Sequence, residues 1–181
     1  HQVELKQFLN LCFRGQRIDS SSNKNLIECY EIGIKHFESY GFTNYFGECS
    51  LKSNSKKIQE LRLAPYDILL SIRGVIPKVA IVGEEASNKI VIANAGILVL
   101  RIRSVDVAQA LYLYCISKVG CETLSKLYQN NSERIGEREI SHFLLPKDFL
   151  HGFKDKFESL CQEGERLKDH QKKIQEILGF L

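Results

Sequence analysis

The sequence predicts an α+β fold, in which a mixed twisted sheet with flanking helices is followed by a long C-terminal coiled-coil-type helix. Two observations carry this prediction. Short apolar runs separated by turn-forming residues fill the centre of the chain, which is typical of strands. From Leu150 onward the apolar residues instead repeat every three or four positions, which is typical of a long helix.

The composition agrees with one globular domain and an appended element. The chain has 181 residues, of which 44% are hydrophobic, and a net charge of only +3. No apolar stretch approaches the roughly 20 residues that span a bilayer, so we expect no membrane contact. The sequence contains no Met, and we therefore expect that His1 is not a native start.

The N-terminal third is less clear than the rest. Residues 3–13 place apolar side chains at helical spacing and predict a short helix. Residues 14–24 are polar and rich in turn formers, which predicts a loop. The type of 27–40 is left open, and 42–57 is expected to be an exposed loop or a frayed hairpin.

Four apolar runs predict four strands, at 66–72, 78–82, 89–93 and 96–103. A turn has to join the first two, because Gly74 and Pro77 lie between them. In the fourth run, apolar residues alternate with Val99, Arg101 and Arg103, and this period of two indicates a half-buried strand.

Helices are expected after these strands. Ser104 is a good N-cap for a helix through Ile116, and a shorter helix is predicted around 122–128. A short segment, 140–145, then leads to Pro146, where we expect the globular part to end.

The C-terminal segment has a heptad-like seam that is interrupted only by a Gly and a Gln. The sequence therefore divides into a domain at 1–149 and a helix at 150–181. For the first turns of that helix, packing against its own domain stays open, whereas the last turns favour a coiled coil. The seam consists of Leu150, Phe153, Phe157, Leu160, Gly164, Leu167, Gln171, Ile174 and Leu178.

The six cysteines are scattered along the chain and form no C-x-x-C pair. The N-terminal residues contain no apolar core of a signal peptide. Both observations favour buried free thiols in a cytoplasmic protein over disulfides or a zinc site.

The order of these parts resembles the target-recognition domain of type I restriction-modification specificity subunits. Residues 67–80 (DILLSIRGVIPKVA) resemble the central signature of that family, and 90–96 (IVIANAG) resemble its next block. Residues 108–117 and 139–146 are similar to its aromatic helix and to the segment before its spacer helix. After Pro146 the chain departs from the family, whose second proline and glutamine-rich stretch are missing here.

The resemblance implies a non-catalytic subunit that recognises double-stranded DNA. Its implied partners are DNA methyltransferase and restriction subunits, together with a second recognition domain that contacts the C-terminal helix. No cofactor or metal is implied. The alternative is a protein-interaction module that assembles through the heptad helix without binding DNA.

No catalytic motif stands out in the sequence. Glu4 and Lys6 match the end of a nuclease motif, but no acidic strand precedes them. The sequence has neither the Asn-Pro-Pro-aromatic motif of methyltransferases nor a glycine-rich cofactor loop. The histidines do not have metal-ligand spacing. A hydrolase with an unfamiliar motif is disfavoured and stays open.

The candidate DNA contacts are basic or amide residues in polar loops and at strand ends, because such side chains bind phosphates and base edges. Arg73, in a turn framed by two strands, is expected to read a base, whereas Lys56 and Lys57 in a polar loop are expected to bind phosphates. A strand-end turn role is an equal alternative for Asn94. The full set is Arg14, Arg17, Lys24, Lys52, Asn54, Lys56, Lys57, Arg73, Lys78 and Asn94.

Overall fold

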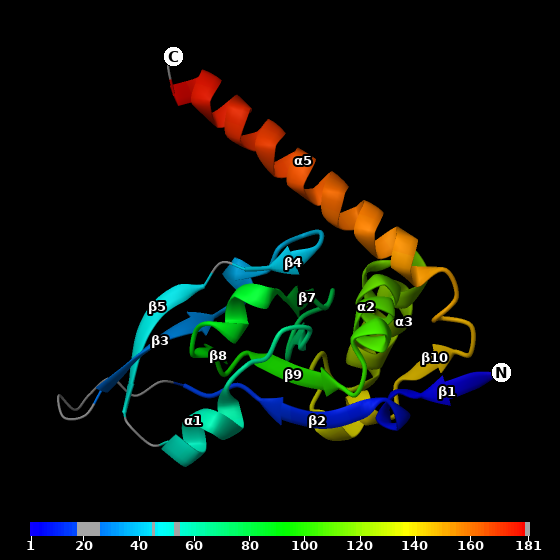
Figure 1. Cartoon of the computed structure of the whole chain (residues 1–181). Coiled ribbons are helices and arrows are strands. Elements are labelled where there is room, and N and C mark those ends of the chain that lie inside the picture. Colours follow the sequence, from blue (N-terminus) through cyan, green and yellow to red (C-terminus); the bar gives the residue numbers. More distant parts are fainter. Residues whose placement is uncertain (18–25, 45, 53–54, 180–181) are drawn as a thin grey trace.

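The structure is a computed structural model that describes residues 1–17, 26–44, 46–52 and 55–179, of which 26–28, 48–52 and 55–57 are described as backbone. It confirms the α+β class, with a mixed sheet, flanking helices and a long C-terminal helix (Figure 1). The strands are β1 (Gln2–Glu4), β2 (Leu9–Arg14), β3 (Leu26–Ile32), β4 (Phe42–Thr43), β5 (Gly47–Lys52), β6 (Ile68–Ser71), β7 (Val79–Val82), β8 (Val91–Ala93), β9 (Ile97–Ile102) and β10 (Leu144–Pro146). The helices are α1 (Ser55–Leu61), α2 (Val105–Ile116), α3 (Lys118–Asn130), α4 (Glu137–Ser141) and α5 (Phe153–Gly179).

The centre of the fold is a five-stranded sheet in the order β2-β9-β6-β7-β4. Neighbouring strands are antiparallel except for β4 and β7, which run parallel. A three-stranded sheet, β5-β3-β8, lies on one side of it, and α2 and α3 lie on the other (Figure 1). All four predicted central strands are present, each within its expected range.

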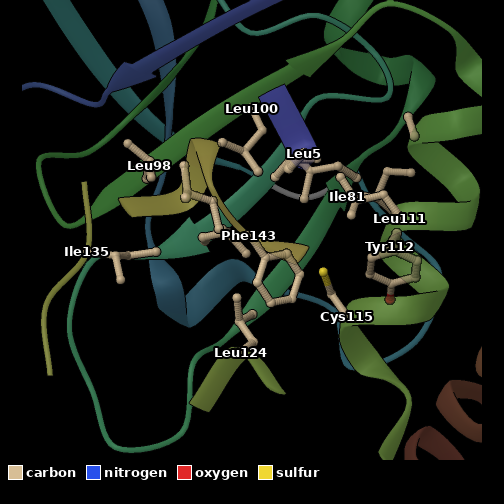
Figure 2. Close-up of a cluster of buried hydrophobic side chains, with 14 of the residues drawn as sticks. Leu5, Ile81, Leu98, Leu100, Leu111, Tyr112, Cys115, Leu124, Ile135 and Phe143 are labelled. Atoms are coloured by element: carbon tan, nitrogen blue, oxygen red, sulfur yellow. The ribbon is translucent and has the colours of Figure 1, made fainter. Parts of the chain in front are cut away.

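Each face of the five-stranded sheet has its own hydrophobic core. On the helical side, Leu98 and Leu100 of β9 pack with residues of α2 and α3 such as Leu111 and Leu124 (Figure 2). On the other side, Ile97 and Val99 of the same strand pack in a second core. The expectation of a half-buried β9 is therefore wrong for 97–100, because a second sheet covers the face that was expected to meet solvent.

β9 is less buried from Arg101 onward, and the Arg101 side chain has a specific partner. Its guanidinium donates two hydrogen bonds to the carboxylate of Asp67, Nε to Oδ1 at 2.9 Å and Nη2 to Oδ2 at 2.7 Å. The Asp67 side chain is 1% exposed and also accepts a hydrogen bond from the backbone N–H of Ala64. Burial raises the pKa of Asp67, and the bonds from Arg101 oppose that shift. The pair ties β9 to the start of β6.

The two middle helices begin at serine caps. The Ser104 hydroxyl accepts a hydrogen bond from the N–H of Val107, which confirms the predicted start of α2. The Ser117 hydroxyl accepts one from the N–H of Gly120, so α3 begins at Lys118, before the predicted 122.

The predicted helix at 3–13 is wrong. Those residues form β1, a 3-10 turn at Leu5–Gln7 and β2. β2 pairs with β9, and β1 pairs with β10, both antiparallel. Because both partners lie far along the chain, local spacing did not indicate them, and strand pairing overrode helix-like periodicity.

The exposed loop or frayed hairpin expected at 42–57 is also corrected. It contains β4, β5 and the start of α1, and β5 pairs not locally but with β3. β3 accounts for part of the unassigned range 27–40 and also runs parallel to β8. These pairings form the sheet that covers the second core.

The free-thiol expectation fails for one cysteine. Cys29 is fully buried and disulfide-bonded, and the β3–β5 register places Cys49 opposite it. The pairing of these strands could not be seen in the cysteine spacing. The free thiols among the described residues are Cys12, Cys115, Cys121 and Cys161.

The helix α5 begins at Phe153, just after the predicted 150. Its first turns pack on the domain, which confirms the alternative that the sequence left open for them. Phe157 is 3% exposed and its ring lies edge-on to those of Phe42 and Tyr112. Gly164 lies against Tyr40, where a Cβ would come within 2.8 Å of the Tyr40 carbonyl oxygen. Beyond it the helix projects from the domain (Figure 1).

The buried pair between β6 and β9 gives a stability prediction. Asp67→Asn leaves the Arg101 charge without its counter-ion, and because Arg101 is 25% exposed we expect a loss of about 2 kcal/mol, below the range for fully buried pairs. Urea unfolding measures it. Glu85→Gln, which breaks the exposed pair with Lys89, is the control and should change stability by less than about 0.5 kcal/mol. Equal effects of the two substitutions would contradict this account.

Candidate nucleic-acid interface

Four of the sequence-predicted contact residues lie at one end of the five-stranded sheet. Because β2, β9, β6 and β7 are successively antiparallel, the last residues of β2 and β6 lie beside the first residues of β9 and β7. Arg14 ends β2, Arg73 follows β6, Lys78 precedes β7 and Asn94 precedes β9. We call this set, with the adjoining segment 131–136, the arginine end.

Arg73 has a cross-strand neighbour that the sequence did not indicate. Arg73 and Arg134 form an isolated antiparallel bridge. On either side of it, the N–H of Ile135 donates to the carbonyl of Ile72 at 3.0 Å, and that of Gly74 donates to the carbonyl of Glu133 at 3.2 Å. The two arginines are therefore directly opposite each other, and both side chains are exposed.

This like-charged pair is unfavourable by itself. Like charges directly opposite each other in a strand pair destabilise it. Among the described residues, no carboxylate forms an ion pair with either Arg73 or Arg134. An anion or a row of hydrogen-bond acceptors between the two guanidinium groups would relieve the repulsion.

The turn after β6 has a rigid base. The hydroxyl of Ser71 accepts a hydrogen bond from the N–H of Lys78 at 2.9 Å. The backbone carbonyl of Ser71 accepts one from the Tyr128 hydroxyl at 2.5 Å. Tyr128 is fully buried, and burial raises its pKa, so the hydroxyl remains a donor. Gly74 has φ +137°, a conformation that residues with a side chain rarely adopt. The turn is thus held at both ends and has one specified bend.

Arg14 and Arg134 line a common hollow of about 490 Å³ beside this turn. The Nε of Arg14 donates to the carbonyl of Ala95 at 2.9 Å, which fixes its guanidinium over the turn before β9. Two carboxylates, Glu137 and Glu139, also line the hollow, and Glu139 accepts a hydrogen bond from the N–H of Gly136. The wall is therefore of mixed charge, with arginines from two separate segments.

Asn94 is engaged in its own turn. Its side-chain oxygen accepts a hydrogen bond from the N–H of Gly96 at 3.0 Å, and its carbonyl accepts one from Ile97 at 3.1 Å. Asn94 thus has the strand-end turn role that was predicted as the alternative to a DNA contact. Arg17 is exposed in the loop after β2, whose Gln16 N–H is bonded to the carbonyl of Ala93.

The other described candidates, Lys52, Lys56 and Lys57, do not lie at strand ends of the five-stranded sheet. Lys52 ends β5 and pairs with the start of β3, at the opposite end of the three-stranded sheet from Ile32 and Ala93. Lys56 and Lys57 lie in α1, so the mobile loop expected for them is wrong. Lys24 and Asn54 lie outside the described residues.

Arg134 is the residue that sequence reasoning missed. It follows the short polar segment 131–133 after α3 and precedes the short helix α4, so it looks like an ordinary surface charge. Ser132 and Glu133, immediately before it, both have positive φ angles, of 56° and 58°. Such backbone conformations in non-glycine residues accumulate at functional sites, but they are not visible in a sequence.

Two further findings come from the described part of the chain. It contains no cluster of three or more His, Cys, Asp or Glu side chains arranged to hold a metal ion. None of its helices combines the length and apolar character that crossing a membrane requires. Compared with models of known protein families and with curated proteins, the chain matches none.

Proposed function

We propose that this chain recognises DNA sequence without catalysing a reaction on it, as one target-recognition domain of a type I restriction-modification specificity subunit. In this proposal it directs methyltransferase and restriction subunits to a target site in the cytoplasm. The ordered sequence blocks support the family assignment. The single structural observation that carries DNA binding is the exposed Arg73–Arg134 pair.

That pair suits DNA in two ways. Arginine binds phosphates as a charged donor, and it binds the O6 and N7 acceptors of guanine with two hydrogen bonds in the major groove. Phosphates and guanine bases both supply the hydrogen-bond acceptors that the two opposed guanidinium groups need as partners. Arg14 and Lys78 extend the positive charge along the same end of the sheet.

A salt titration tests the proposal directly. The purified chain should bind duplex DNA weakly, and its affinity should fall as salt rises, because bound arginines and lysines release counterions. Fluorescence anisotropy at two salt concentrations measures this. Binding that does not depend on salt, or metal-dependent cleavage of the duplex, would contradict the proposal. Absence of binding at low salt would favour the alternative of a protein-interaction module.

Arg73 is predicted to discriminate between sequences. In a complex with the methyltransferase subunits, Arg73→Ala should lower the preference for the cognate half-site by roughly 1–3 kcal/mol, the value of a bidentate contact to guanine. Lys56→Ala and Lys57→Ala, which lie in α1 and outside the arginine end, are the controls and should leave that preference unchanged. Competition between cognate and non-cognate duplexes measures the preference. An even loss of affinity for all sequences with Arg73→Ala, or altered targets with the lysine variants, would contradict the role given to Arg73.

We also propose that the projecting half of α5 contacts a matching helix of a second recognition domain. Leu167, Ile174 and Leu178 are 43%, 56% and 62% exposed, and they continue the seam beyond the turns that the domain covers. Leu160 and Leu167 line a hollow of about 560 Å³ beside Tyr40, next to where a second helix would pack.

Leu167→Asp should weaken this association, because it places a charge in an apolar seam. Sedimentation of the chain over a range of concentrations measures it. Gln162→Asp is the matched control, since it adds the same charge to an exposed position off the seam. If the wild-type chain and both variants sediment as monomers, this interface does not form between copies of the chain.

A further inference from the structure

The turn between β6 and β7 presents two exposed aliphatic side chains at its tip. Val75 and Ile76 are 56% and 69% exposed, although the next residue, Pro77, is buried. The turn needs a glycine at position 74 for its bend, but nothing in its backbone requires aliphatic residues at its tip. Because the base of the turn is bonded to Tyr128 and Lys78, these side chains are held outward on a fixed support.

Positive charge surrounds this apolar tip. Arg73 and Lys78 flank it in the chain, and Arg134 is paired with Arg73. A hollow of about 460 Å³ beside Ile76 is lined by Lys118 and Lys126 of α3, together with the carboxylate of Glu122. Glu133 lies in the segment that bonds to Gly74, and Glu137 and Glu139 line the hollow beside Arg134. Positive side chains therefore outnumber negative ones, and the complementary partner is an anionic surface that also presents apolar groups.

Duplex DNA presents such a surface in its major groove. The C5-methyl group of thymine is the apolar feature there, it lies among the acceptors that arginine and lysine bind, and aliphatic side chains contact it directly. The groove is about 12 Å wide and admits a two-stranded turn.

We propose that Val75 and Ile76 contact thymine methyl groups in the major groove, with Arg73 and Lys78 beside them, so that the target contains thymine at the positions facing this turn. The inference rests on the proposed DNA-binding function and specifies the base that its turn recognises. An apolar surface of a partner protein is the competing occupant. The four flanking basic residues, Arg73, Lys78, Lys118 and Lys126, favour DNA.

Replacing thymine with uracil tests this contact specifically, because uracil differs from thymine only in lacking the C5-methyl group. A duplex is first enriched on the wild-type chain from a random library. It is then made in two forms, with thymine or with uracil throughout, and binding to each is compared. We expect tighter binding of the thymine form, by about fourfold for each methyl group buried.

Variants link that difference to the turn. Ile76→Ala should reduce the ratio between the two forms, and Val75→Thr, which keeps the side-chain shape, should also reduce it. Ile177→Ala, at a 64% exposed position on the projecting part of α5, should leave the ratio unchanged.

The outcomes separate the two levels of the proposal. Equal wild-type affinity for both forms, or a ratio that survives both turn variants, overturns the thymine contact and leaves DNA binding standing. Loss of methyltransferase association in Ile76→Ala, with no thymine effect, assigns the turn to a protein partner and also overturns it. A wild-type chain that enriches no duplex at low salt overturns the DNA-binding function and the thymine contact together.

Discussion

Burial of the five-stranded sheet on both faces is the constraint on which the rest of this structure depends. Helices α2 and α3 cover one face and a second sheet covers the other, so every side chain of β6 is buried. Such a sheet has little freedom to shift its register, because a one-residue slip would exchange the two cores. The ends of its strands, and the turns that join them, are therefore fixed in space.

Fixed strand ends explain how a single turn can hold exposed charges in a defined geometry. Arg73 follows a strand that is locked by two cores, and its turn is tied to the segment 133–135 by backbone hydrogen bonds. The opposed charges of Arg73 and Arg134 are tolerated because this framework sets their positions, and not because they attract each other. In the proposed function, that repulsion in the free protein is relieved when DNA acceptors lie between the two groups.

The parts of the fold that depend on local pattern could be predicted from the sequence. The strands β6, β7 and β8 lie in short apolar runs, and the start of α2 has a serine cap. What failed depended on distant partners. Residues 3–13 became strands because β9 and β10 pair with them, and Cys29 became part of a disulfide in a pairing that its spacing does not show.

The residues of the candidate site were likewise predictable only in part. Arg14, Arg73 and Lys78 could be proposed from residue type and position, and the antiparallel order of the strands places them at one end of the sheet. Arg134 could not be proposed, because its bridge to Arg73 joins segments far apart in the sequence. From the sequence, Lys56 and Lys57 looked equally suitable as DNA contacts. They lie in α1, which follows β5 of the three-stranded sheet.

An NMR titration of the ¹⁵N-labelled chain with duplex DNA at low salt tests the central claim most directly. If the arginine end binds DNA, amide signals of 72–78 and 131–136 should shift together and saturate together, while those of β1 and β10 stay unchanged. Shifts confined to the projecting half of α5, or the absence of any shift at 72–78 and 131–136, would contradict the claim that this end of the sheet is the DNA-recognition surface.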